Sequence, residues 1–243
     1  MATVLNSLQS RGRSPRVHLC MIVKDEASVI GRCLKSVKPH LSGWTIVDTG
    51  STDGTQEAIA EAMQGLPGNL HERPWVDFAT NRNEAMSLVS EEYDYLMIID
   101  ADEVLGGFVM VPFSGADVYQ ITVNCGNRAF PRVWLIKAGY PGKWVGSIHE
   151  DLEVSGRWEL ARLGTIESHN DGARFQDPKR VNKDLALIFA EIEKNPKNPR
   201  WYYYLGATYW AAGDLDQAVK AFQFRLRFKD GDPQEVETIN GLL

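Results

Sequence analysis

Three short apolar runs in the first part of the chain constrain its fold, because an aspartate follows each of them within two residues. The runs are residues 18–23, 44–47 and 95–99, and the aspartates that follow them are Asp25, Asp48 and Asp100. Segments with apolar side chains at helical spacing separate the runs, and this alternation predicts a parallel α/β sheet. Ligands of such sheets bind at the carboxyl ends of the strands. We therefore expect the three aspartates to lie along one edge of the sheet, at a binding site.

The pattern changes after residue 106, where β-like runs at residues 118–123 and 132–137 are separated by glycines and prolines. This spacing is typical of a mixed or antiparallel sheet with long loops. The first domain is therefore predicted to be an α/β mixed sheet with helices on both faces, spanning residues 17–175. Residues 1–16 are polar and are interpreted as a flexible tail.

The second part of the chain is predicted to be helical. A helix at residues 176–196 should connect the domains, and the break Asn-Pro-Lys-Asn-Pro at residues 195–199 ends it. Residues 197–243 resemble one tetratricopeptide repeat, a helix–turn–helix unit. The matching residues are Tyr202, Leu205, Gly206, Tyr209, Gly213, Ala218 and Phe222. Arg225 departs from the small residue expected at its position.

One such repeat cannot bury both of its apolar faces. The C-terminal helices should therefore dock on the first domain, on another chain or on further repeats, so a homo-oligomer or a protein partner is expected, and the chain is interpreted as truncated. The aromatic run at residues 201–204, Trp-Tyr-Tyr-Tyr, is compatible with a sugar-stacking platform. Packing within the repeat is the favoured interpretation.

Charge and cysteine content exclude several classes of protein. There are 26 basic and 32 acidic residues, a net charge of −6, which argues against a broad nucleic-acid-binding surface. The three cysteines form no CxxC pair, which favours reduced thiols and a cytoplasmic location over a disulfide framework or a zinc site. No apolar run approaches the ~18 residues of a membrane span, and the N-terminal residues lack the apolar stretch of a signal peptide.

The sharpest chemical signal is Asp100-Ala101-Asp102, two carboxylates directly after the strongest predicted strand. Hard divalent cations such as Mg²⁺ and Mn²⁺ prefer carboxylate oxygens. A bound cation would stabilise the negative charge of a departing diphosphate. Two solvated acids in a loop are the alternative, and this short motif alone does not separate the two interpretations.

Four motifs in order carry a resemblance to glycosyltransferase family 2, the inverting enzymes of the GT-A fold. The motifs are Met21-Ile-Val-Lys-Asp-Glu26, Ile46-Val-Asp-Thr-Gly-Ser-Thr-Asp-Gly-Thr55, Asn81-Arg-Asn83 and Ile99-Asp-Ala-Asp-Glu103. The resemblance covers residues 17–171. A later motif, Trp144-Val-Gly-Ser-Ile-His-Glu150, resembles a bacterial subgroup with a His-Glu pair and often helical repeats behind it. The resemblance implies the GT-A fold, a nucleotide-sugar donor and a divalent metal, Mn²⁺ or Mg²⁺.

The resemblance also implies a binding site for the nucleotide. Val23, Lys24 and Glu26 match positions that line the base. Asp48 matches an acid that contacts the base or the ribose, although turn formation is an alternative role for an aspartate here. Thr49 stands where many members have a second acid.

The remaining implied roles concern the phosphates and the metal. Arg82 matches a position near the phosphates, for which a guanidinium is a strong partner. Asp100 and Asp102 match the motif that holds the metal and the nucleotide sugar, with Asp102 as the direct metal ligand. His169 lies where many GT-A enzymes supply a third metal ligand. For Asp53, turn and capping chemistry is favoured over function.

Inverting transfer requires a carboxylate that takes the proton of the acceptor as it attacks the anomeric carbon. Glu150 and Asp151 are adjacent candidates for this general base. Glu150 is favoured because the subgroup carries a His-Glu pair here, and Asp151 is the alternative. His149 is expected to orient the base or the acceptor site.

The sequence thus predicts an inverting, metal-dependent glycosyltransferase that uses a nucleotide diphosphate sugar, with a UDP-sugar favoured. The acceptor, whether a saccharide, a lipid-linked sugar or a peptide, is not determined, and a nucleic-acid partner is not expected. A nucleotidyltransferase on a similar sheet is one alternative. The residues after the first strand, however, lack the glycine- and basic-rich loop that such enzymes use to hold a triphosphate. A catalytically inactive scaffold with repeats is the other alternative, and Asp102, Arg82 and Glu150 argue against it.

Overall fold

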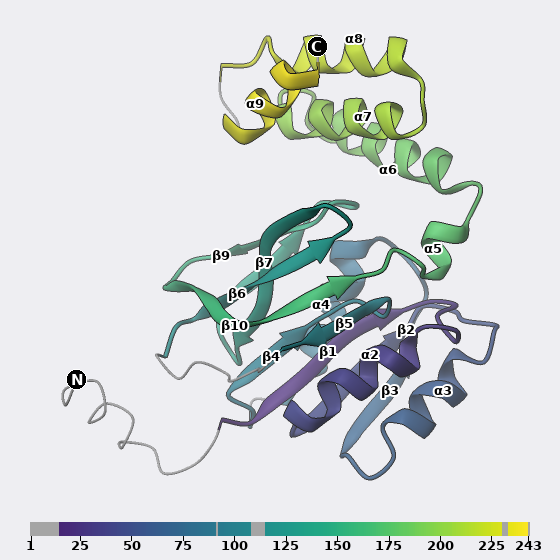
Figure 1. Cartoon of the computed structure of the whole chain (residues 1–243), viewed down its shortest axis with the longest axis vertical. Helices are drawn as coiled ribbons and strands as arrows, with labels where there is room; N and C mark the ends of the chain where they lie inside the picture. Colours follow the sequence, from purple (N-terminus) through teal and green to yellow (C-terminus); the bar gives the residue numbers. More distant parts are fainter. Residues whose placement is uncertain (1–14, 91, 108–114, 230–232, 243) are drawn as a thin grey trace. The chain divides into compact units, whose positions relative to one another are not determined.

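The computed structural model describes residues 15–90, 92–107, 115–229 and 233–242 (Figure 1). Most of the predicted tail therefore lies outside the described residues. Packing divides the chain into two units. The second unit consists of residues 77–79, 145–151 and 177–243, and the first unit comprises the rest of residues 1–176.

The first unit is built on an eight-stranded mixed sheet in the order β3-β2-β1-β4-β7-β6-β10-β5. Four strands pair in parallel: β1 (Val17–Val23), β2 (Gly43–Asp48), β3 (Gly68–Glu72) and β4 (Tyr95–Ile98). The others are β5 (Glu103–Gly106), β6 (Val118–Cys125), β7 (Arg128–Lys137) and β10 (Trp158–Ser168). Pairs β4–β7, β6–β7 and β5–β10 are antiparallel, whereas β6–β10 is parallel. The predicted change from a parallel to a mixed sheet is confirmed.

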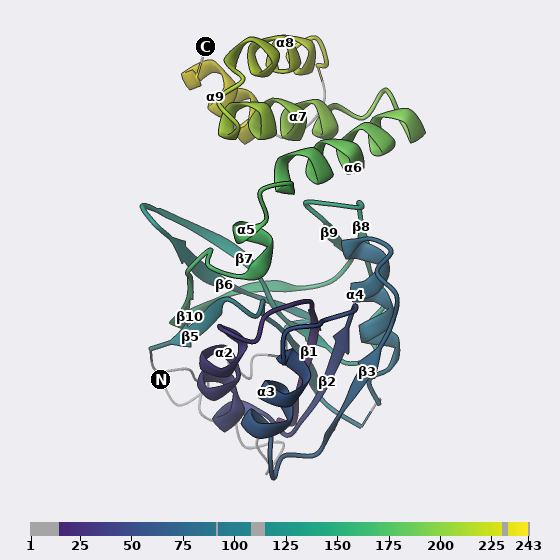
Figure 2. The same cartoon turned by 90° about the vertical axis from the view of Figure 1, so that its right-hand side faces the viewer.

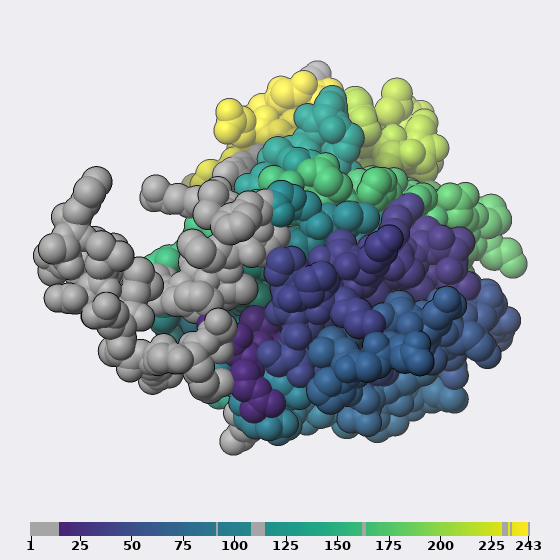
Figure 3. Space-filling model, turned by 60° about the horizontal axis from the view of Figure 1, so that its bottom comes forward, coloured from purple at the N-terminus to yellow at the C-terminus, as the bar shows by residue number. Residues whose placement is uncertain are grey.

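Helices cover both faces of the parallel part of the sheet. Helices α2 (Ile30–Val37) and α3 (Thr55–Ala62) lie on one face and α4 (Phe78–Ser87) on the other (Figures 1 and 2). Figure 3 shows α2 and α3 side by side on the surface. The apolar face of α2 is fully buried, because its apolar residues recur at helical spacing. The helix ends at Val37 and continues as a single 3₁₀ turn that contains Pro39, since proline cannot donate the next helical hydrogen bond.

The core of the first unit consists of apolar side chains from the central strands and α2. Leu19, Ile46 and Met97 of the parallel strands are completely buried. Trp134 of β7 is also completely buried. A two-stranded sheet, β8 (Gly142–Val145) with β9 (Asp151–Val154), completes the strands of the described residues, and a short helix α5 (Ala173–Gln176) follows β10.

The helical unit contains α6 (Arg180–Lys194), α7 (Pro199–Ala211), α8 (Leu215–Arg225) and α9 (Pro233–Leu242). The helices α7 and α8 form the hairpin expected of the repeat. Asn198 caps α7 by accepting a hydrogen bond from the Arg200 N–H at 3.1 Å, and Asp214 caps α8. A Cβ atom on Gly206 would lie 2.4 Å from the Phe222 ring, so only glycine allows this close approach. By contacts, α6 belongs to this unit, although the sequence predicted a connecting helix.

In the parts of the chain that the structure describes, no helix is both long enough and apolar enough to cross a membrane. The three cysteines are free thiols, of which Cys20 and Cys33 are buried.

Arg225, the departure from the repeat pattern, is completely buried and pairs with Glu235 of α9, with Nε 2.9 Å from Oε2. Removing one partner leaves a buried charge uncompensated, which typically costs about 3–5 kcal/mol. We expect Arg225→Met to lower the unfolding free energy of the helical unit by that amount in urea denaturation. The double variant Arg225→Met/Glu235→Leu should recover most of the loss, and Lys220→Met on the exposed surface of α8 is the control. A single variant as stable as the control would contradict this role.

Candidate active site

The predicted edge of the sheet exists. Val23 and Asp48 are register partners at the ends of β1 and β2. The backbone N–H and the hydroxyl of Thr49 both donate to the Val23 carbonyl, at 2.9 and 3.1 Å. Asp100 follows β4, which pairs with the other side of β1. The three strand ends therefore lie next to one another, as the sequence predicted.

Asp48 is completely buried, and its two oxygens accept hydrogen bonds from the loop that follows it and from α3. Oδ1 accepts from the N–H groups of Gly50 and Ser51, at 3.0 and 2.8 Å, and Oδ2 accepts from Gln56 Nε2 at 2.7 Å. This is the turn-forming role that was the alternative prediction for this aspartate. Contact of Asp48 with a base or ribose stays a prediction.

The loops after β1 and β2 are fastened to each other. The Asp25 N–H donates to Ser51 Oγ at 2.8 Å, and Asp25 Oδ1 accepts from the Thr52 N–H at 2.8 Å. Asp53 accepts from the Ala27 N–H and from Thr55, so it closes the turn as expected. Asp25 has a φ of +55°, a conformation in which aspartate is enriched among residues other than glycine. Paired side chains thus fix the shape of the edge beside the candidate site.

Two of the residues predicted to line the base differ in their surroundings. The Val23 side chain is buried in the core of the first unit. The Lys24 side chain is exposed. Binding of a base by either residue stays a prediction.

The motif Asn81-Arg-Asn83 lies on α4, where both asparagines bind backbone groups and Arg82 binds a side chain at the strand edge. Asn81, which is completely buried, accepts from the Val76 N–H and donates to the Pro74 carbonyl. Asn83 exchanges two hydrogen bonds with the backbone of Trp144, at 2.8 and 2.9 Å. Between them, Arg82 points to the strand edge and its Nη2 donates to Asp100 Oδ1 at 2.7 Å. The asparagines hold the flanking loops, which aims Arg82 at the site.

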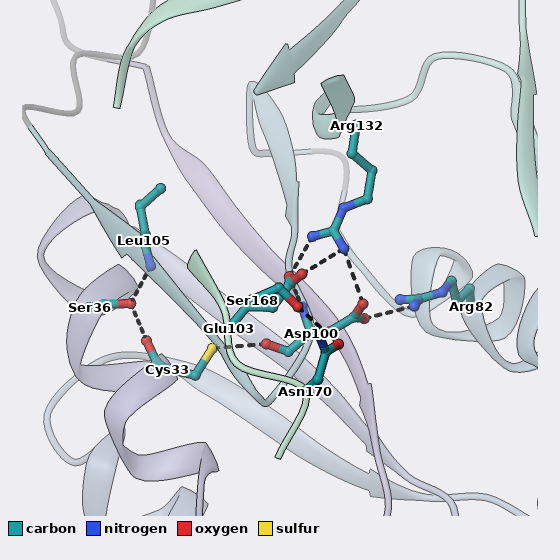
Figure 4. Close-up of polar contacts among 9 residues, drawn as sticks. All are labelled: Cys33, Ser36, Arg82, Asp100, Glu103, Leu105, Arg132, Ser168 and Asn170. Carbon is teal, nitrogen blue, oxygen red and sulfur yellow. Dashed lines mark hydrogen bonds and ion pairs between the residues drawn. The ribbon is translucent and has the colours of Figure 1, made fainter. Parts of the chain in front are cut away.

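Asp100 lies between two guanidinium groups (Figure 4). Arg82 binds Oδ1, and Arg132 Nη1 lies 3.3 Å from Oδ2. Burial alone would raise the pKa of Asp100, but the charges of Arg82 and Arg132 outweigh it and hold the pKa at about 2. Asp100 is therefore ionised at any physiological pH.

Arg132 of β7 is a site residue that the sequence analysis missed. It also donates to both oxygens of the buried Glu103, which in turn accepts from the Asp100 N–H at 2.9 Å (Figure 4). Burial and the Asp100 charge raise the pKa of Glu103, and Arg132 opposes them. The only signal for this residue was a charged side chain inside a predicted strand.

Asp102 differs from Asp100 in having a carboxylate oxygen that accepts no hydrogen bond. Its Oδ2 atom is buried and has no hydrogen-bond partner, and burial together with the Asp100 charge raises the pKa of this carboxyl. A buried carboxylate oxygen that accepts no hydrogen bond, next to a second carboxylate, is suited to binding a cation. The residues present therefore suit a divalent metal with Asp102 as ligand.

Asp102 is not part of a complete metal cage. Among the residues that the structure describes, no three His, Cys, Asp or Glu side chains gather as a ready-made metal site. The backbone N–H of His169, however, lies 3.4 Å from the Asp102 carbonyl, so the chain brings His169 beside the motif. Its role as a ligand stays a prediction. Mg²⁺ is commonly held by one or two carboxylates together with substrate phosphates and water, so a complete cage of protein ligands is not required.

A second ion pair closes this edge. Arg32 of α2 donates to both carboxylate oxygens of Asp171 and to the Asp102 carbonyl, the last at 3.2 Å. Neither Arg32 nor Asp171 was singled out from the sequence, because 139 residues separate them. The pair joins α2 to the loop after β10 and fixes the backbone of the Asp-x-Asp motif.

Glu26 lies at the same edge, where its Oε2 accepts from the Ala173 N–H at 3.3 Å. Burial raises the pKa of Glu26 to about 7, against that hydrogen bond, and the charges of Asp102 and Asp100 add to the increase. The structure thus brings the residue predicted to line the base close to the predicted metal motif.

The pKa of Glu26 predicts a pH dependence. A carboxyl with a raised pKa in the folded state binds its proton more tightly there than when unfolded, so its contribution to stability falls as pH rises from about 4.5 to about 7. In metal-free buffer, we expect the melting temperature of Glu26→Gln to exceed that of the wild type at pH 8 by more than at pH 5. The control is Glu61→Gln on the exposed surface of α3. A pH-independent difference between Glu26→Gln and the wild type would contradict the prediction.

The candidate general bases belong to the other unit. His149, Glu150 and Asp151 lie in the segment Val145–Asp151, which packs with the C-terminal helices. Asp151 is exposed, and its Oδ2 lies 3.6 Å from Arg200 Nη1. Glu150 is partly buried.

The four motifs at the strand edge lie in the part of the chain that matches a known protein family. Residues 19–106, which contain all four of them, match the family model "Glycosyl transferase family 2". This part of the chain, about a third of its length, is therefore similar to glycosyl transferase family 2.

Two curated relatives match the chain over 90 residues, or 37% of its length. One is a TPR repeat-containing protein of Synechococcus elongatus at 41% identity, and the other is an uncharacterized glycosyltransferase of Rickettsia felis at 36% identity. The match covers 21% and 30% of their lengths, so the chain corresponds to less than a third of either relative.

The fold of the chain is similar to that of a solved structure. S. aureus TarS 1-349, crystallised with UDP-GlcNAc, superposes with a TM-score of 0.51 at 10% identity and covers 87% of this chain and 81% of its own. This similarity supports the GT-A fold that the sequence predicted.

Proposed function

We propose that this protein is an inverting, metal-dependent glycosyltransferase that transfers a sugar from a nucleotide diphosphate donor. One observation carries the proposal: Asp102 presents a buried, unpartnered carboxylate oxygen beside Asp100, within the part of the chain that is similar to family 2. A divalent metal bound there would neutralise the diphosphate and stabilise it as a leaving group.

The residues around Asp100 suit the donor phosphates. Arg82 and Arg132 both carry their charges at the strand edge, where each guanidinium is held against Asp100. Such groups form strong bonds with phosphate oxygens. Asp100 therefore keeps two cations in place beside the metal motif, and we propose that Arg82 contacts the diphosphate of the donor.

Glu150 is the proposed general base. In an inverting reaction it takes the proton of the acceptor hydroxyl while that oxygen attacks the anomeric carbon from the face opposite the nucleotide. Asp151 is the alternative base, and its Oδ2 lies 3.6 Å from Arg200 Nη1.

A UDP-sugar is the first donor to test, since TarS, which shares the fold, was crystallised with UDP-GlcNAc. Transfer in the cytoplasm is consistent with three unpaired cysteines. The acceptor class is left to experiment: a saccharide, a lipid-linked sugar and a peptide all offer a nucleophile.

The test is a release assay across UDP-, GDP- and TDP-sugars, with Mn²⁺, Mg²⁺ or EDTA. We expect release of the nucleoside diphosphate from one donor class, with metal required. Pyrophosphate release from a nucleoside triphosphate and a sugar phosphate would instead favour the nucleotidyltransferase. Absence of metal-dependent binding of every donor would favour the inactive scaffold.

A further inference from the structure

The segment Val145–Asp151, here called the base loop, carries Glu150 and packs with helices α6 and α7. Ile148 at its centre is buried to 1% exposure in a cluster with Ile188, Trp201 and Leu205. Gly146 has a φ of +93°, and a Cβ atom there would lie 3.0 Å from the Trp201 ring. The loop is therefore part of the packed interior of the helical unit.

Polar groups of the helices hold the backbone of the base loop at two further points. Glu191 Oε1 of α6 accepts from the Ser147 N–H at 3.3 Å. Arg200 Nη2 of α7 donates to the His149 carbonyl at 2.8 Å, and Arg200 Nη1 lies 3.6 Å from Asp151 Oδ2. The bonds to Arg200 reach the residues on either side of Glu150.

The His149 ring stacks flat on the Tyr204 ring of α7. The ring centroids are 4.0 Å apart and the planes differ by 7°. The Arg200 guanidinium lies 5.0 Å from the centroid of the same Tyr204 ring, so Arg200 and Tyr204 act as one anchor.

The backbone of His149 explains why an anchor is needed. Its φ of +50° is a left-handed conformation, which residues other than glycine adopt at a cost and keep only where the surroundings enforce it. This conformation sets the direction in which the next residue, Glu150, leaves the loop. The stacked ring and the bonded carbonyl are two contacts that hold it.

We propose that Arg200 and Tyr204 are positioning residues of the glycosyltransferase, and that the repeat-like helices thereby set the orientation of the general base. The inference rests on the proposed function, and on the role of Glu150 within it. It assigns α7 a part in catalysis without any contact between α7 and the substrate.

Tyr202 offers a matched control on the same helix. Its ring packs on Phe224 and Phe228, with centroids 4.4 and 5.6 Å away, and its hydroxyl donates to the Pro196 carbonyl. Loss of Tyr202 should thus cost packing energy in the helical unit and leave the contacts to the base loop intact. A merely structural role of Tyr204 would make the two tyrosines equivalent.

The experiment compares Tyr204→Leu, Arg200→Met, Tyr202→Leu and the conservative Tyr204→Phe in the full chain. Hydrogen–deuterium exchange measures how well the backbone amides of the base loop are protected. Turnover is measured as release of UDP from the UDP-sugar that the wild type uses best. For Tyr204→Leu and Arg200→Met we expect faster exchange in residues 145–151. We also expect kcat to fall by up to about 10-fold, with an unchanged KM for the donor. Tyr204→Phe keeps the stack and should restore kcat, and Tyr202→Leu should retain it.

Unchanged exchange in Tyr204→Leu, or faster exchange with an unchanged kcat, overturns the positioning role. Equal losses in Tyr204→Leu and Tyr202→Leu overturn it as well, because they indicate a general loss of stability. If the wild type releases UDP from no donor, the proposed function fails and takes this inference with it, and the exchange data still show separately whether the anchor exists.

Discussion

Replacing Asp102 by alanine should abolish the Mn²⁺-dependent binding of a nucleoside diphosphate and leave the fold intact. The side chain lies after a strand end and presents a buried oxygen without a donor, so its removal breaks no hydrogen bond of that atom. Changes to groups that only orient metal ligands cost about 10- to 100-fold in metal affinity, and loss of a ligand should exceed this. Isothermal titration with UDP, in Mn²⁺ and in EDTA, measures the effect.

The same variant should be more heat-stable than the wild type in EDTA at pH 8. Burial and the Asp100 charge raise the pKa of Asp102, so the ionised form opposes folding as pH rises. Glu61→Gln on the exposed surface of α3 is the control, since it removes a carboxylate outside the Asp-x-Asp motif, and it should keep metal-dependent binding. Undiminished binding of UDP with Mn²⁺ in Asp102→Ala would show that the ligand lies elsewhere.

Replacing Glu150 by glutamine should leave donor binding unchanged and lower turnover by about 10²-fold or more, the usual contribution of a general base. The amide keeps the shape of the side chain but does not accept the proton of the acceptor. Steady-state release of UDP and titration of the donor separate the two effects.

Asp151→Asn is the matched variant for that test. Its exposed carboxylate lies near Arg200, and we expect a smaller loss of turnover from it than from Glu150→Gln. If Asp151→Asn gives the large loss and Glu150→Gln does not, the general base is Asp151. If both variants keep full turnover, the base lies outside this segment.

In the repeat-like helices, most residues that match the tetratricopeptide spacing pack as that spacing predicts, and one residue does not match it. Gly206, Ala218 and Phe222 follow the tetratricopeptide spacing and meet in the α7–α8 hairpin, because contacts within a hairpin depend on residues close in sequence. Arg225 breaks the pattern, and its partner Glu235 became visible only when α9 packed beside α8.

By itself, the sequence determined the mixed α/β sheet and the meeting of Asp25, Asp48 and Asp100 at one edge. Strand and helix periodicities are local, and parallel strands bring their carboxyl ends to the same edge. An aspartate that follows an apolar segment predicted as a parallel strand is therefore expected at the edge formed by the carboxyl ends of the strands.

The tertiary structure alone decided which groups surround these acids. Arg132 meets Asp100 across the sheet, and Arg32 meets Asp171 from 139 residues away. It also placed Glu150 in a loop that packs with the C-terminal helices, although the sequence assigned the two to different domains. Side-chain pairing and loop packing depend on contacts between distant segments, and no periodicity along the chain encodes them.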